Sequence, residues 1–535
     1  MFFYCLKGDY LLYLHFVWND SKQRLMTKRS SIITILTYAI ILCISAMTAC
    51  ADDPTTPDAP EIPDTPELTE PQEAEPVINI LTVNGVEAQK AGDSTYTVKL
   101  AYDVDVRHLS LEAEAPGAIS IGDITLDEDT AIDLSQPLTL TVTTIDGKSQ
   151  NYILAVRYSD LPVIYVETPK EVTGKDDWVK NGRLSIFTDT TDVVALEKVQ
   201  YKGRGNTTWS YAKKPYAIKL DSKTEILGMP KHKRWVLLAN YLDKTLMRNA
   251  VAFEIGRCMS DGLGWTPRGR FVDVVFNGNF IGNYYLCEQI KIDKNRVNIT
   301  EMEASDTDDE SRTGGYLLEY DSYFDEVNKF RTELRNMPVN IKDPDEDVLT
   351  SVHFEYIKDY INDLERSLAT GFSLSDISGV IDVNSFIDWW IANELLQNSE
   401  PCHPKSCYFH KDRNGALRAG PLWDYDYGTL CNVSSNQTWL INESLYYKEL
   451  FTSPDFVARV KERWMLHKPA LSAIPDFIDA TFDAIRESAE INQTLWPTPD
   501  FPNFEGALSY RAAVDRLRAA YIARFNWIDT KITAL

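Results

Sequence analysis

The sequence predicts an α+β protein in which a small all-β module precedes a larger mixed domain. Three observations predict this class. Short β-rich runs ending in turn dipeptides fill residues 78–159, strand patterns with helical insertions fill 160–345, and apolar residues at helical spacing dominate from about 350 onward. A chain of 535 residues is also long enough for two or more domains.

The first 77 residues indicate targeting and a tether. Met26-Thr-Lys-Arg is a short basic start, and the apolar run Ile32–Met47 that follows is too short for a comfortable membrane span. We therefore expect residues 26–49 to be a signal peptide and 1–25 to be a misassigned extension. Residues 50–77 are rich in proline and acidic side chains, which predicts an extended, disordered tether.

Cys50 is the expected site of a lipid anchor. The tetrapeptide Met47-Thr-Ala-Cys50 resembles a bacterial lipobox, and the acidic residues after it resemble the signal that sends lipoproteins of Bacteroides-like bacteria to the cell surface. The resemblance implies a protein anchored by lipid in the outer membrane and facing outward. An ordinary cleaved secretion signal is the alternative.

Charge and cysteine content exclude several classes of site. The net charge of −25 argues against a nucleic-acid-binding surface, which would be basic. The absence of a Cys-x-x-Cys pair argues against a zinc site of the usual spacing. Cys402 and Cys407 are close enough for one disulfide, and buried free thiols are the alternative.

Residues 78–159 are predicted to form a small Ig-like sandwich. Their β-rich runs are short, and two of them end in the turn dipeptides Asn84-Gly85 and Asp146-Gly147. No convergent polar cluster is visible in this stretch, so a spacer role is expected, with glycan binding as the alternative. The strand candidates are Ile78–Gly85, Tyr96–Tyr102, Leu138–Gly147 and Asn151–Arg157.

A glycine-containing loop lies between two predicted strands within Val199–Asp221. Such a loop can bring backbone N–H groups to a phosphate, and basic side chains in and after it could balance the phosphate charge. The alternative is an ordinary surface turn. The loop residues are Gly203, Arg204, Gly205 and Asn206, and the further basic residues are Lys213, Lys214 and Lys219.

The next segments place more acidic residues on predicted elements. Asp243 could cap a helix that follows, or could pair with Arg248. A hairpin around Asn277-Gly278 places Glu288 near the end of its returning strand. The strand Gly314–Asp321 carries Glu319 and Asp321.

The most informative stretch follows a helix that opens at Asp382. A polar loop with Asn398, Glu400, His403 and Lys405 precedes a hairpin around Asn414-Gly415, and Asp424 and Asp426 follow the hairpin. In an extended strand these two carboxylates would share one face and repel each other unless a cation lies between them. A charged surface hairpin is the alternative. Residues 440–535 are expected to be mostly amphipathic helices.

Taken in order, several of these motifs resemble the CotH family of spore-coat-type protein kinases, which has an atypical kinase-like fold. The resemblance spans roughly residues 160–530, and the ordered set is far more specific than any one motif. We therefore expect 160–535 to be a kinase-like catalytic domain. The motifs are Arg204-Gly-Asn-Thr-Thr-Trp209, Lys213-Lys-Pro-Tyr-Ala-Ile-Lys-Leu-Asp221, Trp235–Tyr241, Arg248-Asn249, Asn277–Tyr284, Glu288-Gln289 and Gly420-Pro-Leu-Trp-Asp-Tyr-Asp426.

The resemblance implies phosphoryl transfer from ATP with Mg²⁺ or Mn²⁺ to a protein or another surface acceptor such as a glycan. It implies that Asp424, with Asp426 and Asn398, binds the metal. Lys219 would contact phosphate, with Lys214 in reserve, and Glu288 would orient that lysine or a second cation. Arg204 and Asn206 would complete the nucleotide site.

One position departs from the family pattern. Spore-coat members have an aspartate where this chain has Glu400, the presumed base or ligand. A longer side chain can move the carboxylate by more than an ångström, and a misplacement of that size can cost about a hundredfold in rate. The alternative function is therefore a non-catalytic surface adhesin or glycan-binding lipoprotein that reuses the fold.

Overall fold

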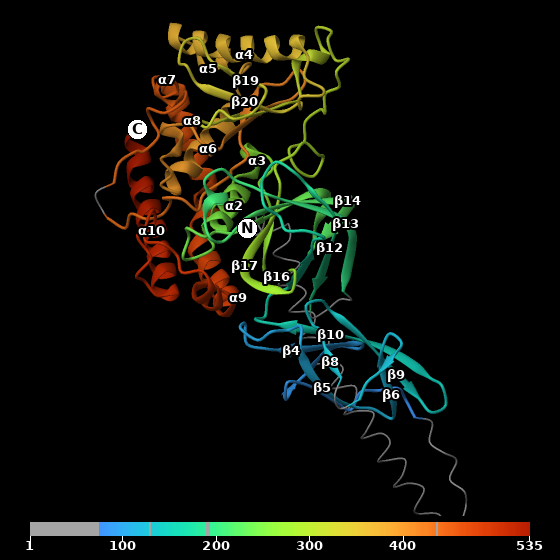
Figure 1. The fold of residues 1–535 in the computed structure, drawn as a ribbon. Helices are drawn as coiled ribbons and strands as arrows, with labels where there is room; N and C mark the ends of the chain where they lie inside the picture. The colour runs from blue at the N-terminus through green and yellow to red at the C-terminus, as the bar shows by residue number, and fades with distance from the viewer. Residues whose placement is uncertain (1–73, 128–129, 189–192, 435–436) are drawn as a thin grey trace, which may run out of the picture. The chain divides into compact units, whose positions relative to one another are not determined.

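The computed structural model describes residues 74–127, 130–188, 193–434 and 437–535. They belong to one compact unit, Ala74–Leu535. Several sheets and many helices confirm the α+β class (Figure 1). The predicted extension, signal peptide, Cys50 and most of the tether lie outside the described residues. No helix among the described residues is long and apolar enough to cross a membrane.

Residues 80–157 form two antiparallel-rich sheets around an apolar core. Successive side chains of a strand point to opposite faces of the sheet, and this alternation explains the core. Val98, Leu140 and Leu154 point inward and are fully buried. One sheet has the order β2-β1-β5-β8 and the other β3-β4-β10-β9-β6-β7. The strands are β1 (Ile80–Val83), β2 (Val86–Glu87), β3 (Gln89–Gly92), β4 (Thr95–Lys99), β5 (Leu109–Glu114), β6 (Gly117–Ile121), β7 (Ile124–Thr125), β8 (Ala131–Ile132), β9 (Leu138–Thr144) and β10 (Ser149–Arg157).

The next part of the chain closes into a barrel, in the order β11-β12-β13-β14-β15-β17-β16. Tyr201, Ile218 and Trp235 pack in its core. The predicted hairpin at Asn277-Gly278 is confirmed and joins β16 to β17. The strands are β11 (Val163–Glu167), β12 (Val179–Phe187), β13 (Val194–Gly203), β14 (Tyr216–Ile226), β15 (Met229–Leu238), β16 (Gly269–Phe276) and β17 (Asn279–Glu288).

A separate 5-stranded sheet has the order β19-β20-β18-β21-β22. The antiparallel register pairs Tyr320 at the end of β18 with Cys407 at the start of β21. This pairing brings the loops beyond both strand ends together, and the candidate site lies there. The strands are β18 (Tyr316–Tyr320), β19 (Lys329–Arg331), β20 (Pro338–Asp343), β21 (Cys407–Lys411) and β22 (Leu417–Ala419).

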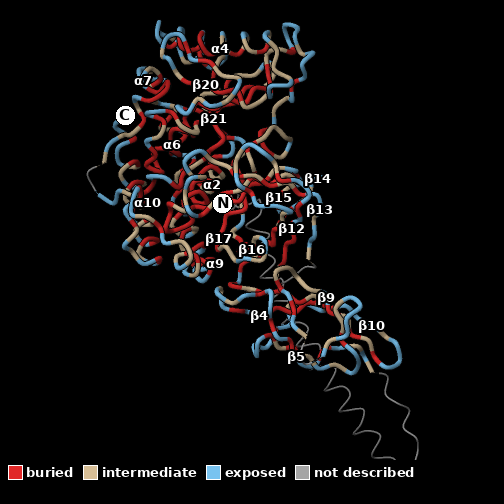
Figure 2. Tube along the Cα trace, viewed as in Figure 1, coloured by how far each residue is buried: buried red, intermediate tan, exposed pale blue. Residues whose placement is uncertain are grey.

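Helix α6 is the central helix of the mixed domain, and every residue from Ser385 to Leu395 is buried. Figure 2 shows the same contrast between buried α6 and the mixed burial of α4. Asp382 caps α6 as predicted, since its side chain accepts from the Ser385 N–H. The helices are α2 (Arg248–Cys258), α3 (Ser260–Leu263), α4 (Ser351–Thr370), α5 (Leu374–Ile377), α6 (Val383–Leu395), α7 (Tyr447–Leu450), α8 (Pro454–Leu471), α9 (Ile474–Leu495) and α10 (Tyr510–Lys531), with short 3₁₀ turns at Thr208–Ser210, Ser311–Thr313, Glu400–Cys402 and Ile532–Ala534.

Helix α2 begins later than the capping prediction implied. Its N-cap is Met247, so the prediction that Asp243 is the N-cap is wrong. The alternative is confirmed, because Asp243 forms an ion pair with the buried guanidinium of Arg248. The Asp243 carboxylate also accepts a hydrogen bond from the backbone N–H of Arg248 at 2.8 Å. It therefore satisfies a backbone donor in the first turn of α2, although it lies outside the helix. Glu505 pairs with the same guanidinium and completes a buried network.

Candidate functional site

The two aspartates that follow the β21–β22 hairpin lie in a loop. The Asn414-Gly415 turn is confirmed, with Asn414 at φ 54°. The prediction that Asp424 and Asp426 lie on an extended strand is wrong: β22 ends at Ala419, and Asp424 has φ 67°, in the left-handed region. The two carboxyl groups nevertheless meet, because a side-chain hydrogen bond links them.

Four carboxyl groups gather beyond the paired ends of β18 and β21, and we call Asp321, Glu400, Asp424 and Asp426 the acidic centre. The Ser406 N–H donates to Asp321 Oδ2 at 3.1 Å, and Ser406 Oγ donates to Asp424 Oδ2 at 3.5 Å. The loop after α6 supplies Glu400. Ser406 therefore links the loop after β18, which carries Asp321, to the loop after β22, which carries Asp424.

Burial and mutual repulsion raise the pKa values of three members of the acidic centre. Burial first, and then the charge of Asp424, raise the pKa of Glu400 from its usual 4.5 to about 8, against the opposing charge of Lys405. The same two causes hold the pKa of Asp426 well above its usual range. Burial also raises the pKa of Asp321. Burial and repulsion therefore favour the protonated forms of these acids, and a bound cation would instead stabilise their charged forms.

Amide side chains fix the backbone around these acids. Asn398 Oδ1 accepts from the Glu400 N–H at 3.1 Å, and its Nδ2 donates to Asn393 Oδ1 at 2.9 Å. Asn503 Nδ2 donates to the Asp426 carbonyl at 2.9 Å. In this arrangement Asn398 orients the Glu400 loop, and its predicted role as a metal ligand stays a prediction.

Two cations lie beside the acidic centre on aromatic rings. The guanidinium of Arg204 is 5.3 Å from the centroid of Trp423, and Lys405 Nζ is 5.3 Å from that of Tyr323. No ion pair within 4.0 Å joins either cation to an acidic side chain in the part of the chain that the structure describes. Both are therefore available to an anionic ligand.

The glycine-containing loop comes close to the acidic centre as well. Thr207 Oγ1 hydrogen-bonds the Tyr323 hydroxyl. Burial and the charge of Asp426 raise the pKa of Tyr211, which places this loop residue near the carboxylates. Glycine at position 203 lets the Trp209 ring pack against the backbone of the loop, because a Cβ there would lie only 2.6 Å from that ring.

The other predicted phosphate-contacting residues are engaged elsewhere. Lys219 pairs across the sheet with Gln200 and Arg234, and burial together with Arg234 lowers its pKa. Lys214 Nζ donates to the Trp209 carbonyl at 2.7 Å, and Asn206 Oδ1 accepts from Lys175 Nζ at 2.9 Å. Among the described residues, no hydrogen bond or ion pair connects Lys219 or Lys214 to the acidic centre.

Glu288 binds arginines and not the predicted lysine. It is fully buried, and Arg268 donates to both of its carboxylate oxygens, at 3.0 and 3.1 Å. Arg296 lies 3.8 Å away. The prediction that Glu288 orients Lys219 is therefore wrong, because the two arginines already neutralise this carboxylate.

Three residues that the sequence singles out occupy positions that it could not predict. Asp321 and Lys405 were visible in their segments, but only the β18–β21 register brings them together. Lys213, adjacent to the reserve lysine, is fully buried, and its Nζ donates to the Ala239 carbonyl at 2.8 Å.

The acidic centre is not a closed protein cage for a metal. Among the described residues, the group of three ligand atoms within 4.8 Å of one another is Asp261, Asp388 and His467, which lie elsewhere. A pair of carboxylates such as Asp424 and Asp426 instead suits Mg²⁺ or Mn²⁺, since such a cation takes its remaining ligands from water and substrate phosphates. The residues present thus fit a metal–nucleotide complex.

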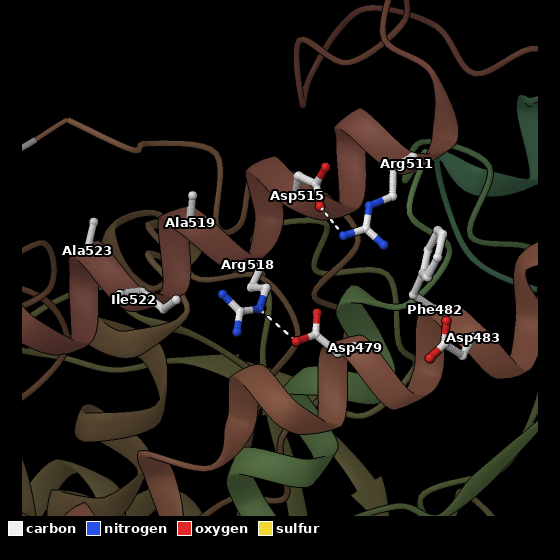
Figure 3. Close-up of a pocket in the computed structure, with 9 residues that line it drawn as sticks. All are labelled: Asp479, Phe482, Asp483, Arg511, Asp515, Arg518, Ala519, Ile522 and Ala523. Carbon is white, nitrogen blue, oxygen red and sulfur yellow. Dashed lines mark hydrogen bonds and ion pairs between the residues drawn. The ribbon is translucent and has the colours of Figure 1, made fainter.

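Two cavities of the described structure lie away from the acidic centre. One of about 560 Å³ lies between α9 and α10 (Figure 3), and its arginines are already paired, Arg518 with Asp479 and Arg511 with Asp515. Another of about 510 Å³ lies along α4. Neither offers a set of free polar groups comparable with the acidic centre.

The cysteines near the site are free thiols. Cys402 is exposed and Cys407 is buried, and neither forms a disulfide. Of the two alternatives for this pair, the structure contains the free thiols.

Comparisons with known proteins place the site in a family context. A family model described as CotH kinase protein matches residues 199–528, more than half of the chain. No curated protein matches it. A solved structure from Bacteroides thetaiotaomicron VPI-5482, described as a candidate glycoside hydrolase, is similar at 16% identity and a TM-score of 0.16, over 50% of this chain and 65% of that one. So low a TM-score carries no argument about fold or function.

Proposed function

Because the chain belongs to the CotH kinase protein family, we propose that it transfers a phosphoryl group from ATP, with Mg²⁺ or Mn²⁺ held by Asp424 and Asp426. The acceptor is a protein or another surface molecule such as a glycan. The mixed domain, in this proposal, is an atypical kinase-like fold.

One observation carries the proposal: the acidic centre gathers four carboxyl groups beside two cations that are free of acidic partners. Protein carboxylates buried together are stable only when they are protonated or bind a cation. Arg204 on Trp423 and Lys405 on Tyr323 supply positive charge that could bind phosphate oxygens. This combination of opposite charges suits a metal–phosphate ligand better than either charge alone.

Each residue then has a defined task. The bound cation would neutralise charge that develops on the transferring phosphoryl group. Arg204 and Lys405 bind and orient phosphate oxygens. Glu400, which lies among these carboxyl groups, would accept the proton of the acceptor hydroxyl. Asp321 fixes the Ser406 N–H beside Asp424.

Lys219 is not assigned a contact with phosphate in this proposal. Its neighbours are Gln200 and Arg234, so its charge contributes to a basic outer surface of the barrel. The alternative function, a non-catalytic adhesin or glycan-binding lipoprotein, remains an outcome of the test below.

The direct test is phosphate transfer by residues 74–535 with labelled ATP and Mn²⁺. We expect incorporation of label into the protein or into an added surface extract, and its loss in Asp424→Asn. Asp479→Asn, which removes a carboxylate from the α9–α10 surface, should leave incorporation unchanged. Nucleotide binding without transfer, or no nucleotide binding with either metal, would favour the non-catalytic alternative.

We further propose that the chain is anchored by lipid at Cys50 in the outer membrane, with the Ig-like module over 78–159 as a spacer. The lipobox-like sequence supports the anchor. Cys50→Ala should abolish lipid labelling and move the protein out of the membrane fraction. An unchanged membrane association in that variant would contradict the anchor.

A further inference from the structure

Three helices of the mixed domain bring together a second group of metal-binding side chains. Asp261 lies on α3, Asp388 on α6 and His467 on α8. His467 Nε2 is 3.4 Å from Asp388 Oδ1 and 3.6 Å from Asp261 Oδ1. None of these residues belongs to the acidic centre. We propose that they bind a divalent transition metal of the Zn²⁺ class.

The unpartnered imidazole nitrogen is the main reason. His467 is 4% exposed, and its Nε2 is buried with no hydrogen-bond partner. Leaving a buried polar atom unpaired destabilises the folded protein. A metal ion would supply the missing partner, because neutral imidazole nitrogen is a common transition-metal ligand.

The distances also suit coordination better than a hydrogen bond. An N–H···O hydrogen bond spans about 2.7–3.2 Å, and a charge-assisted one is shorter. Two ligand atoms each about 2.0–2.2 Å from a tetrahedral Zn²⁺ lie roughly 3.3–3.6 Å apart. The separations of 3.4 and 3.6 Å match the second geometry.

Arg463 is the competing partner in this group. Its Nε donates to Asp388 Oδ1 at 2.9 Å and its NH1 donates to Asp261 Oδ2 at 2.7 Å. Each carboxylate oxygen can accept a second interaction, and metal-binding carboxylates are commonly hydrogen-bonded from outside. One arginine faces two carboxylates here, so its single positive charge leaves room for a cation.

The local backbone holds the group in place. A Cβ on Gly262 would lie 1.8 Å from Asp388 Oδ2, so only glycine allows α3 to approach α6 this closely. The side chain of Asp261 is 54% exposed, which leaves the metal open to water on that side. A mixed N/O set with a water ligand suits Zn²⁺ and Co²⁺ better than Ca²⁺.

The test uses the full chain, with Zn²⁺ alone followed by calorimetry and Co²⁺ alone followed by visible absorption. Wild-type protein should show the intense visible absorption of one Co²⁺ in low-coordinate nitrogen–oxygen ligation, distinct from the weak absorption of any Co²⁺ bound by carboxylates and water at the acidic centre. His467→Gln should lose that signal, and Asp261→Asn should weaken binding at least about tenfold. Asp261 is half exposed, so its variant keeps the test valid if His467→Gln fails to fold.

Two control variants make the result specific. His108→Gln removes an exposed histidine and should leave the Co²⁺ signal intact. Asp424→Asn should leave it intact too, which separates this site from the acidic centre. Wild-type binding of no Co²⁺, an unchanged signal in both His467→Gln and Asp261→Asn, or a signal lost in Asp424→Asn would overturn the proposal.

Discussion

Single side chains of the acidic centre show a conflict between stability and function. Asp426 is buried against Asp424, and its pKa is held well above the usual range because burial and a neighbouring carboxylate disfavour its charged form. Such a group destabilises the cation-free protein at neutral pH. The Asp426 carboxyl group can act as a metal ligand only when a bound cation stabilises its charged form. Substitutions here should therefore separate folding from ligand binding.

Asp426→Asn should stabilise the metal-free protein. The amide mimics the protonated carboxyl group, so the variant avoids ionising a buried acid, and we expect a gain of about 1 kcal/mol in the free energy of unfolding at pH 8. Mn²⁺ should raise the melting temperature of the wild type and not of the variant. Chemical denaturation with and without Mn²⁺ measures both effects. A destabilised variant that still responds to Mn²⁺ would contradict this role.

Arg204→Lys should weaken nucleotide binding and leave metal binding alone. A lysine lacks the planar fork that binds phosphate oxygens in pairs and stacks on Trp423. We expect ATP affinity to fall about tenfold, which corresponds to about 1.4 kcal/mol. Arg511→Lys is the matched control. Arg511 also stacks on an aromatic ring, that of Phe482, but it lies on α10 and is not part of the acidic centre. Equal effects of the two variants on ATP affinity would exclude a specific role for Arg204.

At the scale of elements, the local signals in the sequence predicted well and the long-range pairings could not be predicted. Asn277-Gly278 and Asn414-Gly415 specify their hairpins through residues that tolerate positive φ. Asp382 specifies the start of α6 through its own side chain. The closed barrel and the pairing of β18 with β21 depend on contacts between distant segments. The sequence therefore names Asp321 but could not place it in the acidic centre.

Gly203→Ala tests how the glycine-containing loop is held. An added Cβ would meet the Trp209 ring at 2.6 Å, so the ring or the strand must move. We expect a loss of about 1–3 kcal/mol in the free energy of unfolding and weaker ATP binding. Gly379→Ala is the control, since the nearest atom to its Cβ would be 3.7 Å away. Calorimetry with ATP should show normal binding only in the control.

The β21–β22 hairpin carries a buried histidine that should make stability depend on pH. Burial lowers the pKa of His410 from 6.5 to about 4, and its Nδ1–H donates to the Gly420 carbonyl. Between these values the unfolded chain binds a proton that the folded chain excludes, so stability falls as pH drops from 6.5 towards 4. The full effect is roughly 3 kcal/mol.

His410→Gln should remove this acid-dependent loss, measured as the pH dependence of the free energy of unfolding between pH 7 and 4. The exposed His108→Gln should keep the wild-type slope. A variant at position 410 with an unchanged slope would show that other groups dominate in this pH range.

At the scale of the whole molecule, the net charge is −25. The protein as a whole therefore provides no positive field that would offset the repulsion among the carboxyl groups of the acidic centre. Sequence motifs predicted the family, whereas the roles that they imply for Asp424, Asp426 and Arg204 stay predictions. They could not show that Lys219 lies with Arg234 or that Glu288 is occupied by arginines, because both facts depend on barrel closure. The order of the motifs along the chain therefore predicted the family, but it could not predict which side chains lie in contact.

Metal-dependent ATP binding is the most direct test of the central claim that the acidic centre binds a divalent cation together with a nucleotide. Calorimetry on residues 74–535 should show ATP binding in the presence of Mn²⁺, little binding with chelator, and loss of the Mn²⁺-dependent binding in Asp424→Asn. ATP binding that is equally strong with chelator, or that persists unchanged in Asp424→Asn, would contradict the account.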